Sequence, residues 1–309
     1  MHKKVVPAIY GTMEQSQFTL VIACRNEQPE HLPDWNCPKI IVDDHSDNSP
    51  FAIYNTFNNL KQTAVYNNPY PQGKKYALKY GIEQAQTEYV YLTDADTILP
   101  ERPPQIPQNT DLLILPLKMQ APDTLLGQLQ KAEYTTLQTA TMFFAEKGRA
   151  IMCSGANLIA RRDKWLECFV DLHPEIPSGD DMFLLQAFKK RGLNIRAMYG
   201  SDFTAIISAQ PTLSKLLRQR MRWAGKMPGF SDKDILKIGT TVALSNFLSV
   251  VCPPLWLLKF ACELWLWNKR KQYAFNDNAE WYILLLLSLI YPWYMLVCLI
   301  GGMTRKNLW

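Results

Sequence analysis

Three short apolar segments, each followed by polar residues, limit most strongly the folds open to this chain. They are residues 18–24, 40–42 and 89–92. None has the spacing of a helix, and each is rich in β-branched or aromatic residues, which is typical of buried strands. The sequence therefore predicts several short strands whose ends carry polar groups.

A helix is predicted between the second and third strands. In residues 73–85, the small and aliphatic side chains share one helical face: Ala77, Leu78, Gly81, Ile82 and Ala85. Strand, helix and strand in alternation favour a mostly parallel sheet with right-handed crossovers and helices on its faces. The expected fold class is α/β.

Acidic residues follow each predicted strand. They are Glu27 after the first, Asp43 and Asp44 after the second, and Asp94 and Asp96 after the third. Open α/β sheets bind ligands beyond the carboxyl ends of their strands, so these acids are expected to converge on one crevice. Asp94 and Asp96, one residue apart, could both face a hard cation such as Mg²⁺ or Mn²⁺. An isolated pair of this kind could equally form a polar turn.

A second acidic pair, Asp180 and Asp181, stands just after Ser178 and Gly179 and before an apolar helical pattern. Acidic side chains in the first turn of a helix complement its dipole, so the pair could be a helix start. The same two carboxylates could also perform acid–base chemistry, and one role does not exclude the other.

The segment Gln219–Trp223 reads QRMRW and precedes a long apolar region. On a helix, Gln219, Arg222 and Trp223 share one face. Arg222 could bind phosphate oxygens, Gln219 a hydroxyl, and Trp223 the flat side of a sugar or an acyl chain. An alternative is an interfacial helix whose cations face anionic headgroups. We expect Arg218 and Arg220 to serve the membrane in this way.

Taken together, these motifs resemble those of inverting glycosyltransferases of family two, which have the GT-A fold. The matching residues are 21–27, 42–46, Gly73 and Lys74, 93–96, 154–157, 179–181 and 219–223. The resemblance implies a nucleotide-sugar donor, with Glu27 and Asp44 near the nucleoside and Asp94 and Asp96 at the diphosphate and metal. The resemblance also implies that the chain is a glycosyltransferase of the hexosyltransferase type. Candidate substrate-binding residues are Glu27, Asp43, Asp44, Lys74, Asp94, Asn157, Gln219, Arg222 and Trp223.

The resemblance also implies that Asp181 is the catalytic base. Inversion at the anomeric carbon is a single displacement, in which the acceptor hydroxyl loses its proton as it attacks. Burial, or a neighbouring carboxylate such as Asp180, would raise the pKa of this base. The family usually has Glu-Asp at these positions, so a register shift of one residue would exchange the roles of Asp180 and Asp181.

Two uncharged apolar segments, at about residues 238–258 and 281–303, are long enough to cross a membrane. Pro253 and Pro254 interrupt the first, which either spans or re-enters, whereas the second is expected to span. The predicted organisation is an N-terminal tail at 1–16, a catalytic domain at 17–226 and a membrane region at 227–309. Because sugar nucleotides are made in the cytosol, we expect the catalytic domain on the cytosolic face of the cytoplasmic (inner) membrane.

Composition narrows the remaining functions. The net charge of +5 is modest, and cations gather before the first apolar segment, which suits anionic lipid better than nucleic acid. The seven cysteines show neither CxxC pairs nor the histidine spacing of a zinc site, and they read as reduced residues. The expected partners are a nucleotide sugar, for which a UDP-sugar is predicted, a lipid-linked or glycan acceptor, and membrane lipid.

Other functions stay open at this point. A ceramide-type glycolipid synthase would use the same fold and the same QxxRW pentad, which here is Gln219–Trp223. A catalytically inactive membrane scaffold would keep the fold without needing its acids. A nucleotidyltransferase would want a glycine-rich loop after the first strand, whereas residues 24–27 contain no glycine.

Overall fold

The computed structural model describes residues 16–27, 29, 31–47, 62–176 and 178–304. Nearly all of the expected N-terminal tail lies outside these ranges. The core is a seven-stranded sheet in the order β3-β2-β1-β4-β7-β5-β8. Its strands are β1 Phe18–Cys24, β2 Lys39–Asp43, β3 Thr63–Asn67, β4 Tyr89–Asp94, β5 Leu112–Ile114, β7 Leu158–Arg161 and β8 Ile195–Ala197.

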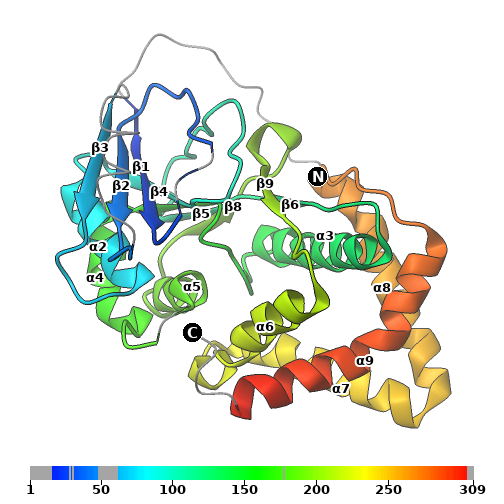
Figure 1. Cartoon of the computed structure of the whole chain (residues 1–309). Helices are drawn as coiled ribbons and strands as arrows, with labels where there is room; N and C mark the ends of the chain where they lie inside the picture. The colour runs from blue at the N-terminus through cyan, green and yellow to red at the C-terminus, as the bar shows by residue number, and fades with distance from the viewer. Residues whose placement is uncertain (1–15, 28, 30, 48–61, 177, 305–309) are drawn as a thin grey trace.

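The predicted α/β class is confirmed, with helices flanking a mostly parallel sheet (Figure 1). The three predicted strands are β1, β2 and β4, which pair in parallel with β1 in the middle. One strand departs from the parallel pattern, because β7 runs antiparallel between β4 and β5. A separate parallel pair joins β6 (Leu117–Gln120) to β9 (Ala205–Ser208).

The predicted helix is α2, Lys74–Gln84, and the expected face packs against β1 and β2. Ala77, Leu78 and Ile82 are almost completely buried. Gly81 is required by close approach, because a Cβ atom there would lie 2.7 Å from Cγ1 of Val21. Local periodicity thus identifies both the helix and the face that enters the core.

The remaining helices extend from the sheet toward the C-terminus. They are α3 Leu125–Glu146, α4 Arg162–Glu167, α5 Asp180–Lys190, α6 Leu213–Ala224, α7 Lys233–Val251, α8 Pro253–Lys269 and α9 Trp281–Thr304. In Figure 1 the last three gather with α3 and α6 on the side away from β1–β3. By length and composition α7 and α9 could cross a membrane, with mean hydropathies of 1.3 and 2.4.

The apolar segment at 238–258 is not one continuous helix. It ends α7 at Val251 and resumes in α8, whose first two residues are Pro253 and Pro254. Proline lacks the N–H that a helix interior needs but is well suited to a first turn. The two prolines therefore begin a new helix and divide the segment.

The last turn of α9 packs tightly against the end of α6. A Cβ atom at Gly302 would lie 2.7 Å from the carbonyl oxygen of Met221 and 2.7 Å from the amide nitrogen of Gly225. Both contacts are with backbone, which cannot rotate away. Because Gly302 has no side chain, α9 can thus contact the end of α6, the helix that carries the pentad.

Gly302→Ala is expected to lower stability by about 1–3 kcal/mol, because an added methyl group must push α6 and α9 apart. Gly239→Ala in α7 is the matched control, since a Cβ atom there meets nothing within 4 Å. That control should be neutral or more stable by up to about 1 kcal/mol, from helix propensity alone. Thermal unfolding of both variants in detergent measures the difference, and equal melting temperatures would contradict the packing.

Candidate active site

The acids after β2 and β4 lie at the same edge of the sheet, as expected. Asp44 is buried and does not stand free for a ligand. Its carboxylate accepts from Nδ2 of Asn68 at 2.8 Å and from the backbone N–H of Gly73 at 2.9 Å. Asp44 therefore fixes the turn that begins α2. Neighbouring Asp43 accepts hydrogen bonds from the hydroxyl and backbone N–H of Ser46.

Lys74, the first residue of α2, joins two acidic motifs that are distant in sequence. Its Nζ lies 2.6 Å from Oδ1 of Asp94 and 3.0 Å from Oδ2 of Asp180. Against the effect of burial, these two carboxylates raise the pKa of Lys74. The lysine therefore stays charged and holds the end of β4 beside the start of α5.

The two acids at the start of α5 differ in their surroundings. Although burial opposes it, the Lys74 ammonium lowers the pKa of Asp180. Asp181 makes no ion pair with any residue that the structure describes, and its Oδ1 accepts from the N–H of Met182 at 2.7 Å. Burial raises the pKa of Asp181, with the Lys226 charge opposing and Asp180 adding to the shift. One carboxylate is thus neutralised, and the other has the character of a base.

Lys226, which the sequence analysis does not single out, also belongs to this cluster. Lys226 is only 8% exposed. Its side chain crosses Gly179, where an added Cβ atom would lie 2.9 Å from Cδ of Lys226. Gly179 has φ of 88° and precedes α5, so it needs both the missing side chain and the left-handed conformation. No local pattern reveals this contact, because it joins two loops.

The predicted pentad lies on α6, and its members separate. Trp223 packs against a buried cluster that includes Tyr134 and Ala156, whereas Arg222 is exposed. Gln219 is half-buried, and its Oε1 accepts from Arg220 at 2.6 Å. The three side chains therefore have different surroundings, and their shared ligand stays a prediction.

The expectation that Arg220 serves the membrane is wrong. Its side chain is buried and forms an ion pair of 2.9 Å with Glu133 of α3. Its guanidinium also stacks 4.1 Å from the ring centroid of Trp223. Arg218 is exposed, as expected for a residue on the outer face.

Asn157 lies in the interior rather than on the surface of the site. Its Oδ1 accepts from the hydroxyl of Tyr91, and its Nδ2 donates to the carbonyls of Pro116 at 2.7 Å and Phe203 at 3.1 Å. All its polar atoms are thus used inside the protein, which differs from the expected substrate contact. Asn157 holds together the strands that support the acids, whereas Glu27 and Asp96 are exposed.

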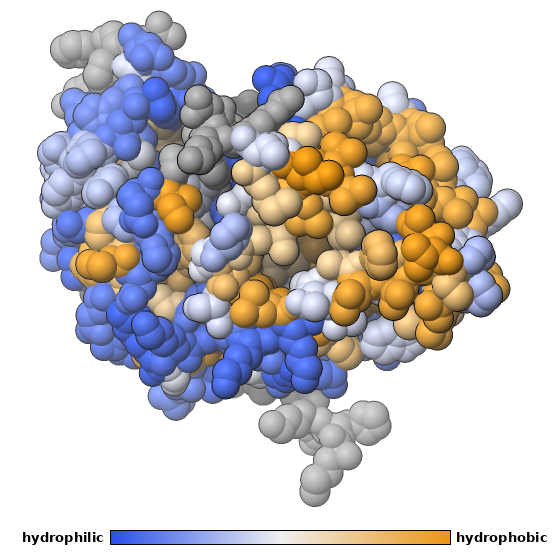
Figure 2. All heavy atoms as spheres, turned by 90° about the horizontal axis from the view of Figure 1, so that it is seen from below, coloured by the Kyte–Doolittle hydropathy of each residue, from blue (hydrophilic) through white to orange (hydrophobic). Residues whose placement is uncertain are grey.

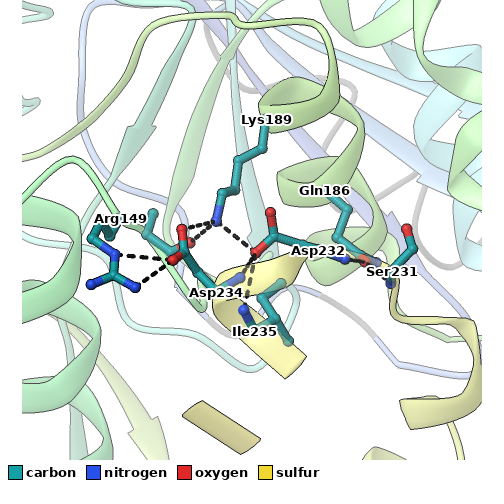
Figure 3. A network of polar contacts seen from close by, with 8 residues as sticks. Arg149, Gln186, Lys189, Ser231, Asp232, Asp234 and Ile235 are labelled. Carbon is teal, nitrogen blue, oxygen red and sulfur yellow. Dashed lines mark hydrogen bonds and ion pairs between the residues drawn. The ribbon is translucent and has the colours of Figure 1, made fainter. Parts of the chain in front are cut away.

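The far end of α5 is joined to the first apolar helix (Figure 3). Nζ of Lys189 lies 2.7 Å from Asp232, which caps α7, and 3.1 Å from Asp234 in its first turn. Arg149 also binds Asp234, at 2.6 Å, and Gln186 accepts from the backbone N–H of Ser231. This network links the helix that carries Asp180 and Asp181 to α7.

Lys189→Met is expected to cost about 1–3 kcal/mol of stability, because it removes a half-buried charge from two carboxylates and a backbone carbonyl. Lys190→Met is the matched control, since that side chain is 77% exposed and reaches Asp171 only at 4.0 Å. An exposed pair contributes about 0–1 kcal/mol. Urea unfolding measures both, and equal losses would contradict the network.

The acids fit a divalent metal only as partial ligands. Among the described residues no group of three or more His, Cys, Asp or Glu could hold a metal by itself. Asp94 and Asp96 supply hard oxygen donors, and Mg²⁺ usually completes its shell with water and phosphate oxygens. The donor set is therefore suited to a metal that arrives with a diphosphate.

The sequence model described as "Glycosyltransferase like family 2" matches residues 52–226, more than half of the chain. The chain therefore belongs to this family, and it is a glycosyltransferase with a GT-A fold. No curated protein matches it.

Several solved structures are similar to this chain, and one of them shows the same fold. The mannosyltransferase PcManGT from Pyrobaculum calidifontis, in complex with GDP-Man and Mn²⁺, has a TM-score of 0.53 at 14% identity, covering 95% of this chain and 89% of that one. S. aureus TarS has a TM-score of 0.43 at 14% identity, covering 72% and 41%. Glucosyl-3-phosphoglycerate synthase from Mycobacterium tuberculosis has 0.42 at 16% identity, covering 70% and 81%. The likeness to PcManGT concerns the fold alone.

Proposed function

We propose that this glycosyltransferase is anchored to the membrane and moves a hexosyl group, with inversion, from a nucleotide sugar to a lipid-linked or glycan acceptor. The observation that carries the proposal is the Lys74 bridge between Asp94 and Asp180. It brings the acids expected at the diphosphate next to the acids expected at the acceptor. A displacement at the anomeric carbon requires these two sets of acids to lie no farther apart than the length of one sugar.

In this proposal Asp181 is the general base. The carboxylate accepts the proton of the acceptor hydroxyl as its oxygen attacks the anomeric carbon, and the nucleoside diphosphate leaves from the opposite face. A raised pKa favours this role, since a stronger base takes the proton more readily. Asp180, neutralised by Lys74, orients the lysine instead.

Donor recognition is assigned to the edge formed by β1, β2 and β4, where exposed Glu27 faces the nucleoside and the buried Asp43 and Asp44 fix the turns beside it. Asp94 and Asp96 would hold Mg²⁺ or Mn²⁺, which supplies charge stabilisation to the departing diphosphate. Arg222, exposed at the end of α6, is available to phosphate oxygens. PcManGT binds GDP-Man with Mn²⁺, so the donors to be tested include GDP-sugars as well as UDP-sugars.

We assign residues 17–226 to the catalytic domain and 227–309 to a juxtamembrane and membrane region. Support for anchoring comes from α7 and α9, of which only 17% and 22% is buried inside the protein. Exposed apolar helices of this length need a lipid environment. The catalytic domain is placed on the cytosolic face, where sugar nucleotides are made, and cleavage of that domain by protease added outside sealed cells would contradict the placement.

The test is nucleoside diphosphate release from a panel of sugar nucleotides by the full chain in lipid, with Mn²⁺, Mg²⁺ or EDTA. Acceptor lipid extract is included. We expect release from one donor, dependent on metal, and loss of release in Asp96→Ala. Metal-independent release would refute the Asp94 and Asp96 site, and no release from any donor would favour a scaffold without catalysis.

The pH profile provides a separate prediction. The acid limb of kcat/KM should follow the ionisation of Asp181 and lie above the usual range of an aspartate, since activity requires the unprotonated base. Lys226→Met removes the charge that lowers the pKa of Asp181, so the limb should move to higher pH. Lys226→Arg keeps the charge and should leave the limb in place. An unmoved limb in Lys226→Met would exclude this coupling.

A further inference from the structure

Helices α3, α7, α8 and α9 enclose a cavity of about 530 Å³. Aliphatic side chains form most of its wall, among them Leu137, Ala140, Val242, Leu258, Leu266 and Leu287. Sites for small ligands are typically about 300–1,000 Å³ and mainly apolar. Figure 2, seen from below, shows apolar side chains gathered on one half of this face, with the surface hollowed between them. The size and lining of this helix cavity suit the hydrocarbon part of a lipid.

The wall of the helix cavity is in contact with the pentad on α6. Glu133 of α3 lines the cavity and holds Arg220 at 2.9 Å, and Arg220 in turn stacks on Trp223. The next residue, Tyr134, belongs to the buried cluster that Trp223 and Ala156 complete. A lipid with its tail in the cavity would therefore have its head group beside the pentad.

Charges around the helix cavity are balanced. Arg220 is paired with Glu133, and the buried Lys259 is paired with Glu263 at 2.7 Å and donates to Ser288. Both cations are thus in ion pairs within the described part of the chain, Lys259 in the cavity wall and Arg220 behind it, although Nε of Arg220 has no hydrogen-bond partner there. A phosphate group in this cavity would find no spare positive charge.

One polar atom in the wall lacks a partner. Asn246 is 2% exposed, its Nδ2 donates to the carbonyl of Val242 at 2.9 Å, and its Oδ1 has no hydrogen-bond partner among the described residues. Buried acceptors are normally satisfied, so an orphaned oxygen in a ligand-sized cavity points to a donor on the ligand. An O–H or amide N–H near the lipid's head would supply it.

The acceptor chemistry at Asp181 points the same way. A lipid phosphate is already ionised near neutral pH and attacks without losing a proton, so it needs no general base. A lipid alcohol must give up its proton, and it does so only with a base within reach. The paired Asp180 and unpaired Asp181 suit the second kind of acceptor.

We infer that the acceptor is an uncharged lipid alcohol whose hydrocarbon chain occupies the helix cavity and whose second O–H or N–H group, separate from the attacking hydroxyl, donates to Oδ1 of Asn246. Ceramide has this chemistry, whereas diacylglycerol has one hydroxyl, which must attack, and so lacks the second donor. The inference rests on the proposed function and specifies its acceptor. In the reaction, the C–O bond to the nucleoside diphosphate breaks, the lipid oxygen bonds to the anomeric carbon, and the hydroxyl proton passes to Asp181.

The activity test uses the full chain with phosphatidylcholine vesicles that contain dioleoylglycerol, ceramide or a polyprenyl phosphate. We expect glycosylation of ceramide, which has a second donor for Asn246. Asn246→Leu should raise the KM for that lipid about tenfold, through loss of one hydrogen bond, and leave kcat and the donor KM unchanged. Leu244→Phe, on the exposed face of the same helix, should match wild type. Transfer to polyprenyl phosphate alone, or an unchanged lipid KM in Asn246→Leu, would overturn the inference.

Binding is measured separately through Cys262, which lines the helix cavity. In a Cys252→Ser background the other cysteines are buried, so N-ethylmaleimide reports Cys262. Ceramide should slow its labelling several-fold relative to vesicles of phosphatidylcholine alone, and equal labelling would overturn the inference. Transfer to a soluble glycan with no lipid protection defeats the inference alone, whereas no nucleoside diphosphate release from any donor defeats the proposed function itself.

Discussion

Asp181→Asn is expected to lower kcat about 10²–10⁴-fold, the usual contribution of a general base, while the donor binds as in the wild type. The amide keeps the size of the side chain but cannot accept the proton of the acceptor hydroxyl. Single-turnover transfer and donor binding, measured on the same preparation, separate the chemical step from affinity.

Asp180→Asn is the matched comparison, one residue away on the same helix turn. Because Asp180 holds Lys74 at 3.0 Å, its loss should weaken donor binding more than it lowers kcat. If Asp180→Asn abolished the chemical step and Asp181→Asn kept it, the two roles would be exchanged. The register ambiguity of the motif would then be resolved in the opposite sense.

Arg220→Met is expected to cost about 3–5 kcal/mol of stability, the usual loss when one partner of a buried ion pair is removed. The Arg220 and Glu133 side chains are 6% and 12% exposed, so Glu133 would be left buried with an uncompensated charge. Arg218→Met, on the exposed side of the same helix, should change stability by about 0.5 kcal/mol or less. Chemical unfolding in detergent measures both variants.

The double variant Glu133→Leu, Arg220→Met tests whether the loss belongs to the pair. Replacing both charges by apolar groups removes the unpaired carboxylate, so much of the stability should return. If the double variant were as unstable as the sum of the two single variants, the ion pair would not explain the effect.

The sequence predicts much of the sheet but not its whole pattern. Strands β1, β2 and β4 are recognisable because a buried strand needs a short apolar run that ends in polar residues. Strand β7 is different, since its direction depends on which neighbours it pairs with after α3 has crossed the sheet. Its antiparallel pairing with β4 is a tertiary choice that the four residues Leu158–Arg161 do not encode by themselves.

The sequence likewise predicts part of the candidate site and leaves the rest to the tertiary structure. Motifs place Asp94, Asp180 and Asp181 at strand and helix ends, and the resemblance to the family assigns their roles. Neither says which acid Lys74 neutralises, because that depends on the spatial approach of α2, β4 and α5. The motifs also leave the position of the Asn157 side chain undecided, since a polar residue after an apolar run can face a ligand or fill a buried hydrogen-bonding position.

Arg220 shows the physical limit most clearly. A run of cations on an amphipathic helix is compatible with anionic lipid, and nothing near Arg220 in the sequence indicates a buried carboxylate. Glu133 lies 87 positions away and reaches it only because α3 and α6 pack together.

Short-range properties are what this sequence determines by itself: strand runs, the buried face of α2, the division of the apolar segment at Pro253, and acids at the ends of strands. These follow from side-chain periodicity and backbone chemistry, which act over a few residues. The tertiary structure alone decided the partners of charged groups, namely Lys74 with two acids, Arg220 with Glu133, and Lys226 beside Asp181. A charged side chain is stable either in water or in a buried ion pair. Only the packing of the helices and strands determines which of these two environments surrounds it.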